Sequence, residues 1–345
     1  MTNILLSSAG RRSYLVNYFK DALQGNGKVF ASNSEYTSAL DCADESVITP
    51  LIYSPDYIDF VLNYSKEHEI KAIIPLFDID AAILAKNKKR FSDEHITVIT
   101  GSTEALNICN DKWAMYRFLT RNNIRTPRTY LKPEDCLAAV KEQSLSYPIV
   151  IKPRWGMGSI GIFFAEDEEE LIVLSRKVRR DIFNTYLKYE SKQDVGQCVI
   201  FQEKMNGTEF GLDVINDLQG NYVITSVKRK IAMRAGETDI AITADVPVLS
   251  DIGRQLSYLL KQAGNLDVDC FMVGDQPYVL EMNCRFGGQF PFSYLAGVDL
   301  PRQIVKWLNG EETDLSLLTP SGDVLSTKEL VPTRCAFRET PGVRQ

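Results

Sequence analysis

Polar residues alternate with apolar ones in a short run that ends in a glycine pair, and this run constrains the chain more than any other. Residues 278–288 read Tyr-Val-Leu-Glu-Met-Asn-Cys-Arg-Phe-Gly-Gly. Side chains of a β-strand repeat on one face at every second residue, so Glu281, Asn283 and Arg285 are predicted to project from the same face. Because an unpaired buried polar group costs about 1–3 kcal/mol, a mostly apolar strand with such a face indicates a binding site.

The run before it, residues 266–273, also has the composition of a strand, and residues 274–276 are predicted to form the tip of a hairpin. In that hairpin Asp269 lies opposite Glu281. Their carboxylates and the amide oxygen of Asn283 are oxygen ligands, which suit a hard cation such as Mg²⁺. The guanidinium beyond them could grip an anion that the cation also contacts. A solvated hairpin face with a salt bridge is the alternative interpretation.

Short apolar runs alternate with amphipathic runs in the first third of the chain. Strands are expected at 3–8, 29–31, 71–75 and 96–99, and helices at 13–23, 57–68 and 80–91. This alternation predicts a parallel sheet with helices on both faces. Ligands of such sheets bind at the carboxyl ends of the strands, where Ser8, Gly10, Phe77 and Asp78 fall. Asp78 and Asp80 are equally explained as helix-capping residues. The Gly-x-Gly-x-x-Gly fingerprint of NAD sites is absent.

A glycine-rich segment follows an apolar strand in the middle of the chain. A helix is expected from Asp111-Lys112 to about residue 121, and a strand at 147–153 that carries Lys152 near its end. The glycines of residues 154–161 lead into a second short strand at 162–165. Backbone amides in such a loop can close over phosphate groups. An ordinary glycine hairpin is the alternative.

The remaining segments are expected to continue as mixed helix and strand. Expected are a helix at 166–180, a loop at 181–197, a strand, hinge and strand at 198–214, a strand at 222–231, helices at 251–263 and 301–308, and peripheral strands up to residue 338 before a loose tail.

Four of these features stand in an order that resembles the ATP-grasp superfamily, in particular the branch of the carbamoyl phosphate synthetase large subunit and the pyrrolysine-pathway ligase. They are Asp111-Lys112, the lysine and glycine loop at 152–161, the segment 203–209, and Glu281-x-Asn283-x-Arg285. Residues 8–12, Ser-Ala-Gly-Arg-Arg, are similar to the opening of that branch's N-terminal domain. The resemblance extends from about residue 3 to about residue 310.

The resemblance implies an α/β fold that becomes α+β in its C-terminal part. A Rossmann-like domain at 1–110 is expected to precede a two-lobed ATP-grasp fold, with its small lobe at 111–195 and its large lobe at 196–310. Residues 311–345 would form a C-terminal extension.

The resemblance also implies a role for each matched residue. For ATP, it implies phosphate contacts from Lys112 and Lys152 and a flap that contains Gly156, Gly158 and Ser159. It further implies an adenine hinge at Glu203, Lys204 and Met205, and Glu209 as the carboxylate that holds the ribose. For Mg²⁺, one or two ions with Mn²⁺ as an alternative, it implies Asp269, Glu281 and Asn283 as ligands. Several relatives carry Gln or Glu where this chain has Asp269, which leaves the ligand oxygen but changes its reach. The implied catalytic residues are Arg285, Lys152 and Lys228, and the implied substrate contacts are Gly10, Arg11 and Arg234.

The activity implied is a carboxylate-amine ligase that phosphorylates an acid with ATP, forms an acyl phosphate and releases ADP and phosphate. Only two histidines occur in the chain, and phosphoryl transfer needs alignment and charge stabilisation rather than a histidine nucleophile. Two alternatives stay open. One is a carboxylase or carbamoyl-phosphate type of enzyme that phosphorylates bicarbonate, and the other is a regulatory protein that binds nucleotide without turnover.

Composition restricts the partners. The net charge of −6 disfavours a nucleic-acid partner, because binding a phosphate backbone needs a dense basic surface. No apolar run reaches the roughly 18 residues that a membrane span requires, and no signal peptide is recognised. The seven cysteines form no Cys-x-x-Cys pair, which disfavours a thiolate metal site. We therefore expect a cytoplasmic enzyme with small-molecule carboxylate and amine substrates, and the family suggests a homodimer.

Overall fold

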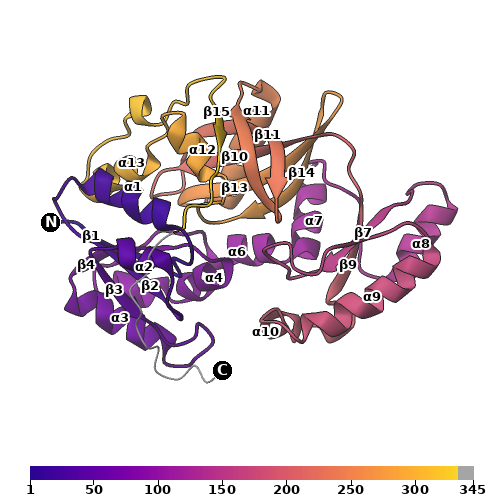
Figure 1. The fold of residues 1–345 in the computed structure, drawn as a ribbon, viewed down its shortest axis with the longest axis horizontal. Helices are drawn as coiled ribbons and strands as arrows, with labels where there is room; N and C mark the ends of the chain where they lie inside the picture. The colour runs from indigo at the N-terminus through magenta and orange to yellow at the C-terminus, as the bar shows by residue number, and fades with distance from the viewer. Residues whose placement is uncertain (333–345) are drawn as a thin grey trace.

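Three β-sheets organise the chain, and the computed structural model describes residues 1–332 of it (Figure 1). A five-stranded parallel sheet forms the N-terminal domain, a four-stranded antiparallel sheet forms the small lobe, and a six-stranded antiparallel sheet forms the large lobe. The predicted fold class is confirmed. No helix of the described residues is long and apolar enough to cross a membrane.

The N-terminal sheet has the strand order β3-β2-β1-β4-β5. Its strands are β1 (Asn3–Ser7), β2 (Val29–Asn33), β3 (Glu45–Ile48), β4 (Ile70–Pro75) and β5 (Thr97–Val98), and its helices are α1 (Ser13–Leu23), α2 (Ser38–Cys42), α3 (Tyr57–Glu67), α4 (Asp78–Lys86) and α5 (Lys88–Ser92). The order reverses between β1 and β4, which is where such sheets form a ligand crevice. Ser8 and Gly10, at φ 52° and 57°, turn the chain out of β1 in left-handed conformations beside this crevice.

Helix α1 has the predicted bounds because its apolar residues repeat at helical spacing. Leu15, Val16, Phe19 and Leu23 are buried on one face. The single helix predicted at 80–91 was wrong. Asn87 lies between α4 and α5, and its side-chain amide donates to the carbonyl of Ile83 at 2.9 Å. The asparagine thus caps the end of α4, and the chain starts a new helix after it.

Two helices lead from the N-terminal domain into the small lobe. The elements are α6 (Thr103–Asn110), α7 (Lys112–Arg121), β6 (Thr129–Tyr130), α8 (Pro133–Lys141), β7 (Ile149–Pro153), β8 (Phe163–Ala165), α9 (Glu168–Ile182), α10 (Lys188–Ser191), a 3-10 turn (Val195–Gln197) and β9 (Val199–Glu203). Asp111 starts α7 by accepting from the backbone amides of Trp113 and Ala114. The loop predicted at 181–197 was partly wrong, because α10 and the 3-10 turn lie in it.

The large lobe has the strand order β14-β13-β10-β11-β12-β15. Its elements are β10 (Thr208–Asn216), β11 (Tyr222–Arg234), β12 (Glu237–Thr243), α11 (Pro247–Leu260), β13 (Gly264–Val273), β14 (Gln276–Asn283), α12 (Phe290–Leu295), α13 (Leu300–Leu308), a 3-10 turn (Leu315–Leu317) and β15 (Leu325–Thr327). Strand β15 is the peripheral strand expected after residue 310. The predicted continuation beyond 332 lies outside the described residues.

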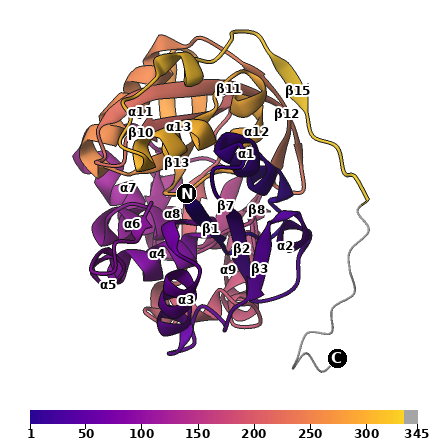
Figure 2. The ribbon, with the colours of Figure 1, turned by 90° about the vertical axis from the view of Figure 1, so that its left-hand side faces the viewer.

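The core of the N-terminal domain continues into the end of the large lobe. Phe19 of α1 lies in one apolar cluster with Phe286 and with Ile304 of α13. The rings of Tyr18 and Tyr294 stack with their centroids 3.5 Å apart. Figure 2 shows α1 lying beside α13 above the N-terminal sheet. This shared core fixes the crevice of the N-terminal domain against the large-lobe sheet.

Candidate active site

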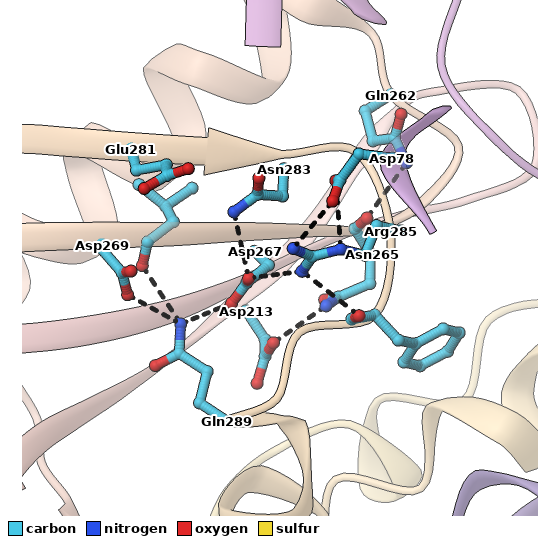
Figure 3. Close-up of polar contacts among 12 residues, drawn as sticks. Asp78, Asp213, Gln262, Asn265, Asp267, Asp269, Glu281, Asn283, Arg285 and Gln289 are labelled. Carbon is cyan, nitrogen blue, oxygen red and sulfur yellow. Dashed lines mark hydrogen bonds and ion pairs between the residues drawn. The ribbon is translucent and has the colours of Figure 1, made fainter. Parts of the chain in front are cut away.

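The hairpin of β13 and β14 brings the two predicted acids together. Its register pairs Asp269 with Glu281, as the sequence predicted, and both face the polar cluster of Figure 3. Lysines from other elements neutralise them: Lys230 Nζ lies 2.7 Å from Asp269 Oδ1, and Lys112 Nζ lies 2.8 Å from Glu281 Oε1. Burial raises the pKa of Asp269 to about 6 although Lys230 opposes this rise. Burial also opposes ionisation of Glu281, but Lys112 and Lys152 outweigh it and lower the pKa of that carboxyl.

Asn283 lies two residues beyond Glu281, at the end of β14. Its amide nitrogen donates to Asp267 Oδ2 at 3.4 Å, which leaves its oxygen free to act as a ligand. No cluster of three or more His, Cys, Asp and Glu side chains suited to a metal exists among residues 1–332. Besides the two acids, the amide oxygen of Asn283 is the third candidate oxygen ligand of this set. Two carboxylates and one amide oxygen fit the chemistry of Mg²⁺.

Two lysines predicted to bind phosphate are both almost fully buried, but their surroundings differ. Lys112, in the first turn of α7, donates to the carbonyl of Gly156 at 2.7 Å as well as to Glu281. Lys152, near the end of β7, is 6% exposed, and its ammonium has no hydrogen bond or ion pair within residues 1–332. Burial and the nearby charge of Lys112 lower the pKa of Lys152 to about 8. A buried ammonium without a partner is costly, so this position favours an anionic ligand.

Lys230 is a site residue that the sequence did not single out. Its ammonium lies 2.6 Å from Glu209 and 2.7 Å from Asp269, and its side chain is 5% exposed. Burial opposes its charge, but the two carboxylates outweigh burial and raise the pKa of this lysine. Glu209, predicted to hold the ribose, is thereby joined to the acidic hairpin. Strand alternation along 228–231 was the available signal, because it places every second basic residue on one face.

Lys228 occupies a different environment from the one its predicted catalytic role requires. Its side chain is fully buried, and its ammonium contacts Asp213 and donates to Ser293 Oγ at 2.8 Å. Asp213 also accepts from Asn265 at 2.9 Å and from Ser293 at 2.6 Å. Each of these groups already has its partners inside the protein, so this geometry favours a structural role for Lys228.

Arg285 lies where β14 leaves the large-lobe sheet, and two carboxylates hold its guanidinium (Figure 3). Nη1 donates to Asp267 Oδ2 at 2.7 Å. Asp78, from the first turn of α4 in the N-terminal domain, lies 3.1 Å from Nε and accepts from Nη2 at 3.3 Å. Gln289 donates to Asp267 at 2.5 Å and to Asp269 at 3.3 Å, which links the arginine to the acidic hairpin. The sequence suggested Asp78 only as a crevice or capping residue and missed Asp267 and Gln289.

The predicted flap lies between β7 and β8 and contacts the large lobe. Gly158, Ser159 and Gly161 have φ values of 61°, 57° and 72°, which bend the loop back on itself. A Cβ atom built on Gly236 would lie 2.2 Å from Ser159 Oγ, so the tip of the flap touches the turn between β11 and β12. The carbonyl of Gly156 holds Lys112 at the base of the flap.

The residues predicted to form the adenine hinge lie at the end of β9, whose last residue is Glu203. The backbone amide of Glu203 donates to the carbonyl of Arg128 at 2.9 Å, and its carboxylate accepts from the amide of Arg128 at 3.1 Å. Lys204 lies over the ring of Phe164 at 5.5 Å. Met205 follows in the connection to β10. The hinge is therefore anchored to the chain segment that enters the small lobe.

The predicted substrate contacts are spread over two elements. The amide of Gly10 donates to Asn33 at 3.3 Å, and Arg11 is exposed in the turn before α1. Arg234 lies at the other side, at the tip of β11, where it pairs with Asp239 and donates to the carbonyl of Lys328 at 3.2 Å. The described contacts do not bring Arg234 to the two N-terminal residues.

The small lobe also touches the N-terminal domain through a segment that was predicted as plain loop. Tyr189 stacks on Tyr53 with ring centroids 4.0 Å apart, and Tyr53 donates to Glu190 at 3.3 Å. Tyr186 meets Phe77 edge to face, with centroids 6.1 Å apart. A cleft of about 950 Å³ lies next to these contacts, between α4, α6, α7 and Trp155.

Comparison with known proteins identifies the family of the chain. A model of the PylC-like N-terminal domain matches residues 4–99, and a model of the ATP-grasp domain matches residues 109–289, which is over half of the chain. The chain belongs to the ATP-grasp family. In this ATP-grasp protein the matched domain contains the flap, the hinge and the acidic hairpin, while Asp78 lies in the other matched domain.

Several relatives share this architecture. The carbamoyl phosphate synthase large chain of Methanoculleus marisnigri is 22% identical over 309 residues, which is 85% of this chain but only 28% of that protein. The biotin carboxylase domain dimer of Hydrogenobacter thermophilus 2-oxoglutarate carboxylase, with MgADP, ADP and bicarbonate, superposes with a TM-score of 0.68 at 18% identity and covers 90% of this chain and 70% of that one. An L-amino acid ligase from Bacillus licheniformis reaches 0.65 at 18% identity and covers 93% and 78%. These structures share the ATP-grasp fold with this chain.

Proposed function

We propose that this ATP-grasp protein is an ATP- and Mg²⁺-dependent carboxylate-amine ligase that acts through an acyl phosphate and releases ADP and phosphate. The observation that carries the proposal is Lys152, a lysine that is 6% exposed and lacks a partner among the described residues. It lies within electrostatic range of Lys112, Asp269 and Glu281. A polyphosphate would supply the negative charge that this lysine lacks, and the acids are suited to the cation that accompanies it.

The nucleotide would lie between the two lobes. Lys112 and Lys152 would contact its phosphates, and the flap amides of Gly156, Gly158 and Ser159 would close over them. At its other end, Glu203, Lys204 and Met205 would contact adenine and Glu209 the ribose. A bound Mg²⁺, held by Asp269, Glu281 and Asn283, would neutralise charge on the phosphates.

The reaction would proceed in two steps. A carboxylate oxygen of the acid attacks the γ-phosphorus of ATP, the bond from that phosphorus to the β,γ-bridging oxygen breaks, and ADP leaves. The amine nitrogen then attacks the acyl carbon, the carbon-oxygen bond to phosphate breaks, and the nitrogen loses a proton. Lys152 and Arg285 would stabilise the charge on the transferred group, and the flap would exclude water that hydrolyses the acyl phosphate. Gly10 and Arg11, at the crevice of the N-terminal domain, and Arg234 would contact substrates.

Phosphate release tests the proposal. The full chain, with ATP and Mg²⁺, is screened against pools of carboxylic acids and amines, and hydroxylamine replaces the amine in a parallel series. An acyl phosphate reacts with hydroxylamine to give a hydroxamate, so acid-dependent hydroxamate is the specific readout. We expect release that requires both an acid and an amine. We also expect a homodimer, which sedimentation of the purified chain checks, and a cytoplasmic location, which cell fractionation checks.

Matched variants of the acidic hairpin provide the control. Glu281→Ala removes a proposed metal ligand and is expected to lower phosphate release at least about 100-fold. Asp275→Ala removes an exposed acid at the tip of the same hairpin and should leave the rate unchanged. Equal release by Glu281→Ala and the parent would contradict the metal assignment. Release with bicarbonate alone would favour a carboxylase, in keeping with the fold shared with the bicarbonate-bound carboxylase domain.

A further inference from the structure

The guanidinium of Arg285 is held by carboxylates from two different domains. Asp267, from β13 of the large lobe, is the tighter partner at 2.7 Å. Asp78 comes from α4 of the N-terminal domain, 207 residues away along the chain. Both carboxylate side chains are 8% exposed and the arginine side chain is 13% exposed, so the three charges lie in a largely enclosed position.

Asp78 is itself fixed in place. It lies in the first turn of α4, directly after the crevice between β1 and β4. Its backbone carbonyl accepts from the side-chain amide of Asn110, at the end of α6, at 3.1 Å. A negative charge in the first turn of a helix is favoured by the helix dipole. These features fix the backbone at Asp78 and so limit where its carboxylate can lie, whereas a long arginine side chain without it would have several rotamers.

The two carboxylates fix the plane of the guanidinium. Nη1 is directed at Asp267, while Nη2 and Nε face Asp78 on the neighbouring edge. Removal of Asp78 would leave Arg285 attached through Nη1 only, so the group could rotate about that contact. Positioning within a fraction of an ångström matters for charge stabilisation in phosphoryl transfer.

We propose that Asp78 is a positioning residue, through which the N-terminal domain holds Arg285 in the orientation that binds the transferred phosphoryl group. The inference rests on the proposed function, because it takes Arg285 to face that group. Asp78 itself touches no reacting atom in this scheme. The ATP-grasp domain would then depend on its neighbour for the geometry of its own arginine, and not only for substrate binding.

An experiment without the unidentified acid can test this inference. Aluminium fluoride with MgADP imitates the planar phosphoryl group during transfer, and an arginine that holds this group slows the release of ADP. The release of radiolabelled ADP from the full chain is measured with and without aluminium fluoride. We expect fluoride to slow release strongly in the parent, and Asp78→Asn to reduce this slowing about tenfold or more, as for loss of one charged hydrogen-bond partner. Release of MgADP alone should be the same in both, which a general loss of structure would not allow.

Further variants separate positioning from folding. Asp56→Asn, an exposed acid of the same domain without a side-chain hydrogen bond, should behave as the parent does. Asp78→Glu keeps the charge and should retain most of the slowing, and it gives the answer if Asp78→Asn does not fold. Arg285→Lys by itself should abolish the slowing of ADP release. Adding Asp78→Asn to that variant should change the release rate little.

Two results would overturn the inference. One is equal slowing in Asp78→Asn and the parent, and the other is loss of slowing in Asp78→Glu to the level of Arg285→Lys. A parent whose ADP release does not respond to fluoride would contradict the proposed function itself, and the inference with it. Slowing in the parent that Lys152→Met abolishes and Asp78→Asn leaves intact would keep the function and reject only the role of Asp78.

Discussion

Lys152 and Lys228 are both buried lysines, yet the protein treats them in opposite ways. Lys228 is fully buried and makes its contacts with Asp213 and Ser293 inside the large lobe. Lys152 is 6% exposed, has no partner in the described part of the chain, and has a pKa lowered to about 8, chiefly by burial. Direct contacts offset the cost of burying the charge at Lys228, whereas at Lys152 only the more distant carboxylates of Asp269 and Glu281 oppose that cost.

This difference separates a structural charge from a binding charge. A buried pair with complete hydrogen bonds can hold elements together without any ligand. A buried ammonium without a contacting counter-charge lowers stability until an anion binds, which is why we infer an anionic ligand at Lys152. Both lysines were assigned catalytic roles from sequence, and the geometry favours that role for Lys152 alone. Lys230, two residues beyond the paired lysine and on the same strand, faces the acidic hairpin instead.

The largest expected effect is a loss of stability on replacing Lys228, and its absence would contradict the structural role in this comparison. Lys228→Met leaves Asp213 buried with less compensation, and we expect a loss of about 3–5 kcal/mol in the free energy of unfolding. Urea denaturation measures it. Folded Lys228→Met should bind MgATP as the parent does, and adding Asp213→Leu should recover much of the stability. Unchanged stability with lost turnover would instead make Lys228 catalytic.

At Lys152 the expected effect is on ligand binding rather than folding. Lys152→Met would remove the proposed charged contact to phosphate, and we expect about 10- to 100-fold weaker MgATP binding by calorimetry. Its free energy of unfolding without nucleotide should stay level or rise, because a buried charge has been removed. A destabilised variant with normal nucleotide affinity would reverse the assignment of the two lysines.

A pH series sharpens the same contrast. The pKa of Lys152 lies near 8 without ligand, so the side chain is an ammonium below that pH and becomes a neutral amine above it. Phosphate binding favours the ammonium, and MgATP affinity should therefore fall about tenfold between pH 7 and pH 9. Lys152→Arg keeps its charge over this range and should show a flat profile. A parent with a flat profile would show that this amine does not contact the nucleotide.

The smallest effect is expected for an exposed cation, Arg234. It is paired with Asp239 and its side chain is 44% exposed, so solvent screens the interaction. Arg234→Gln should change the free energy of unfolding by less than about 1 kcal/mol and leave MgATP affinity unaltered. A change confined to the KM of one substrate would support its proposed substrate contact. A large loss of stability would show that the exposed fraction of Arg234 does not predict its contribution to the free energy of unfolding.

The sequence predicted best those features that depend on local periodicity. The bounds of α1 and the pairing of Asp269 with Glu281 follow from spacing of 3.6 and 2 residues, and both predictions were confirmed. The flap was placed correctly between its two strands because glycines and flanking apolar runs are close in the chain. Helix 80–91 failed because one asparagine side chain ends α4, which a periodic pattern hides.

What the sequence could not predict was contact between distant segments. Asp78 and Arg285 meet only because the N-terminal crevice is packed against the large-lobe sheet. The side chain of Gln289 reaches Asp267 by passing close to Gly211. A Cβ atom built on Gly211 would lie 1.3 Å from the side-chain oxygen of Gln289. The roles of the individual site residues stay predictions, and the geometry alters which of them we would test first.

The packing of α13 on α1 has a consequence for protein engineering. The apolar interior of the N-terminal domain is completed by α13, which follows both matched family domains in the sequence, so a cut between those two domains would divide one apolar interior. Chimeras that exchange the N-terminal domain among related proteins should therefore carry the matching Leu300–Leu308 helix with it. A donor domain grafted without that helix would expose Phe19 and its neighbours, and aggregation rather than altered specificity would be the outcome.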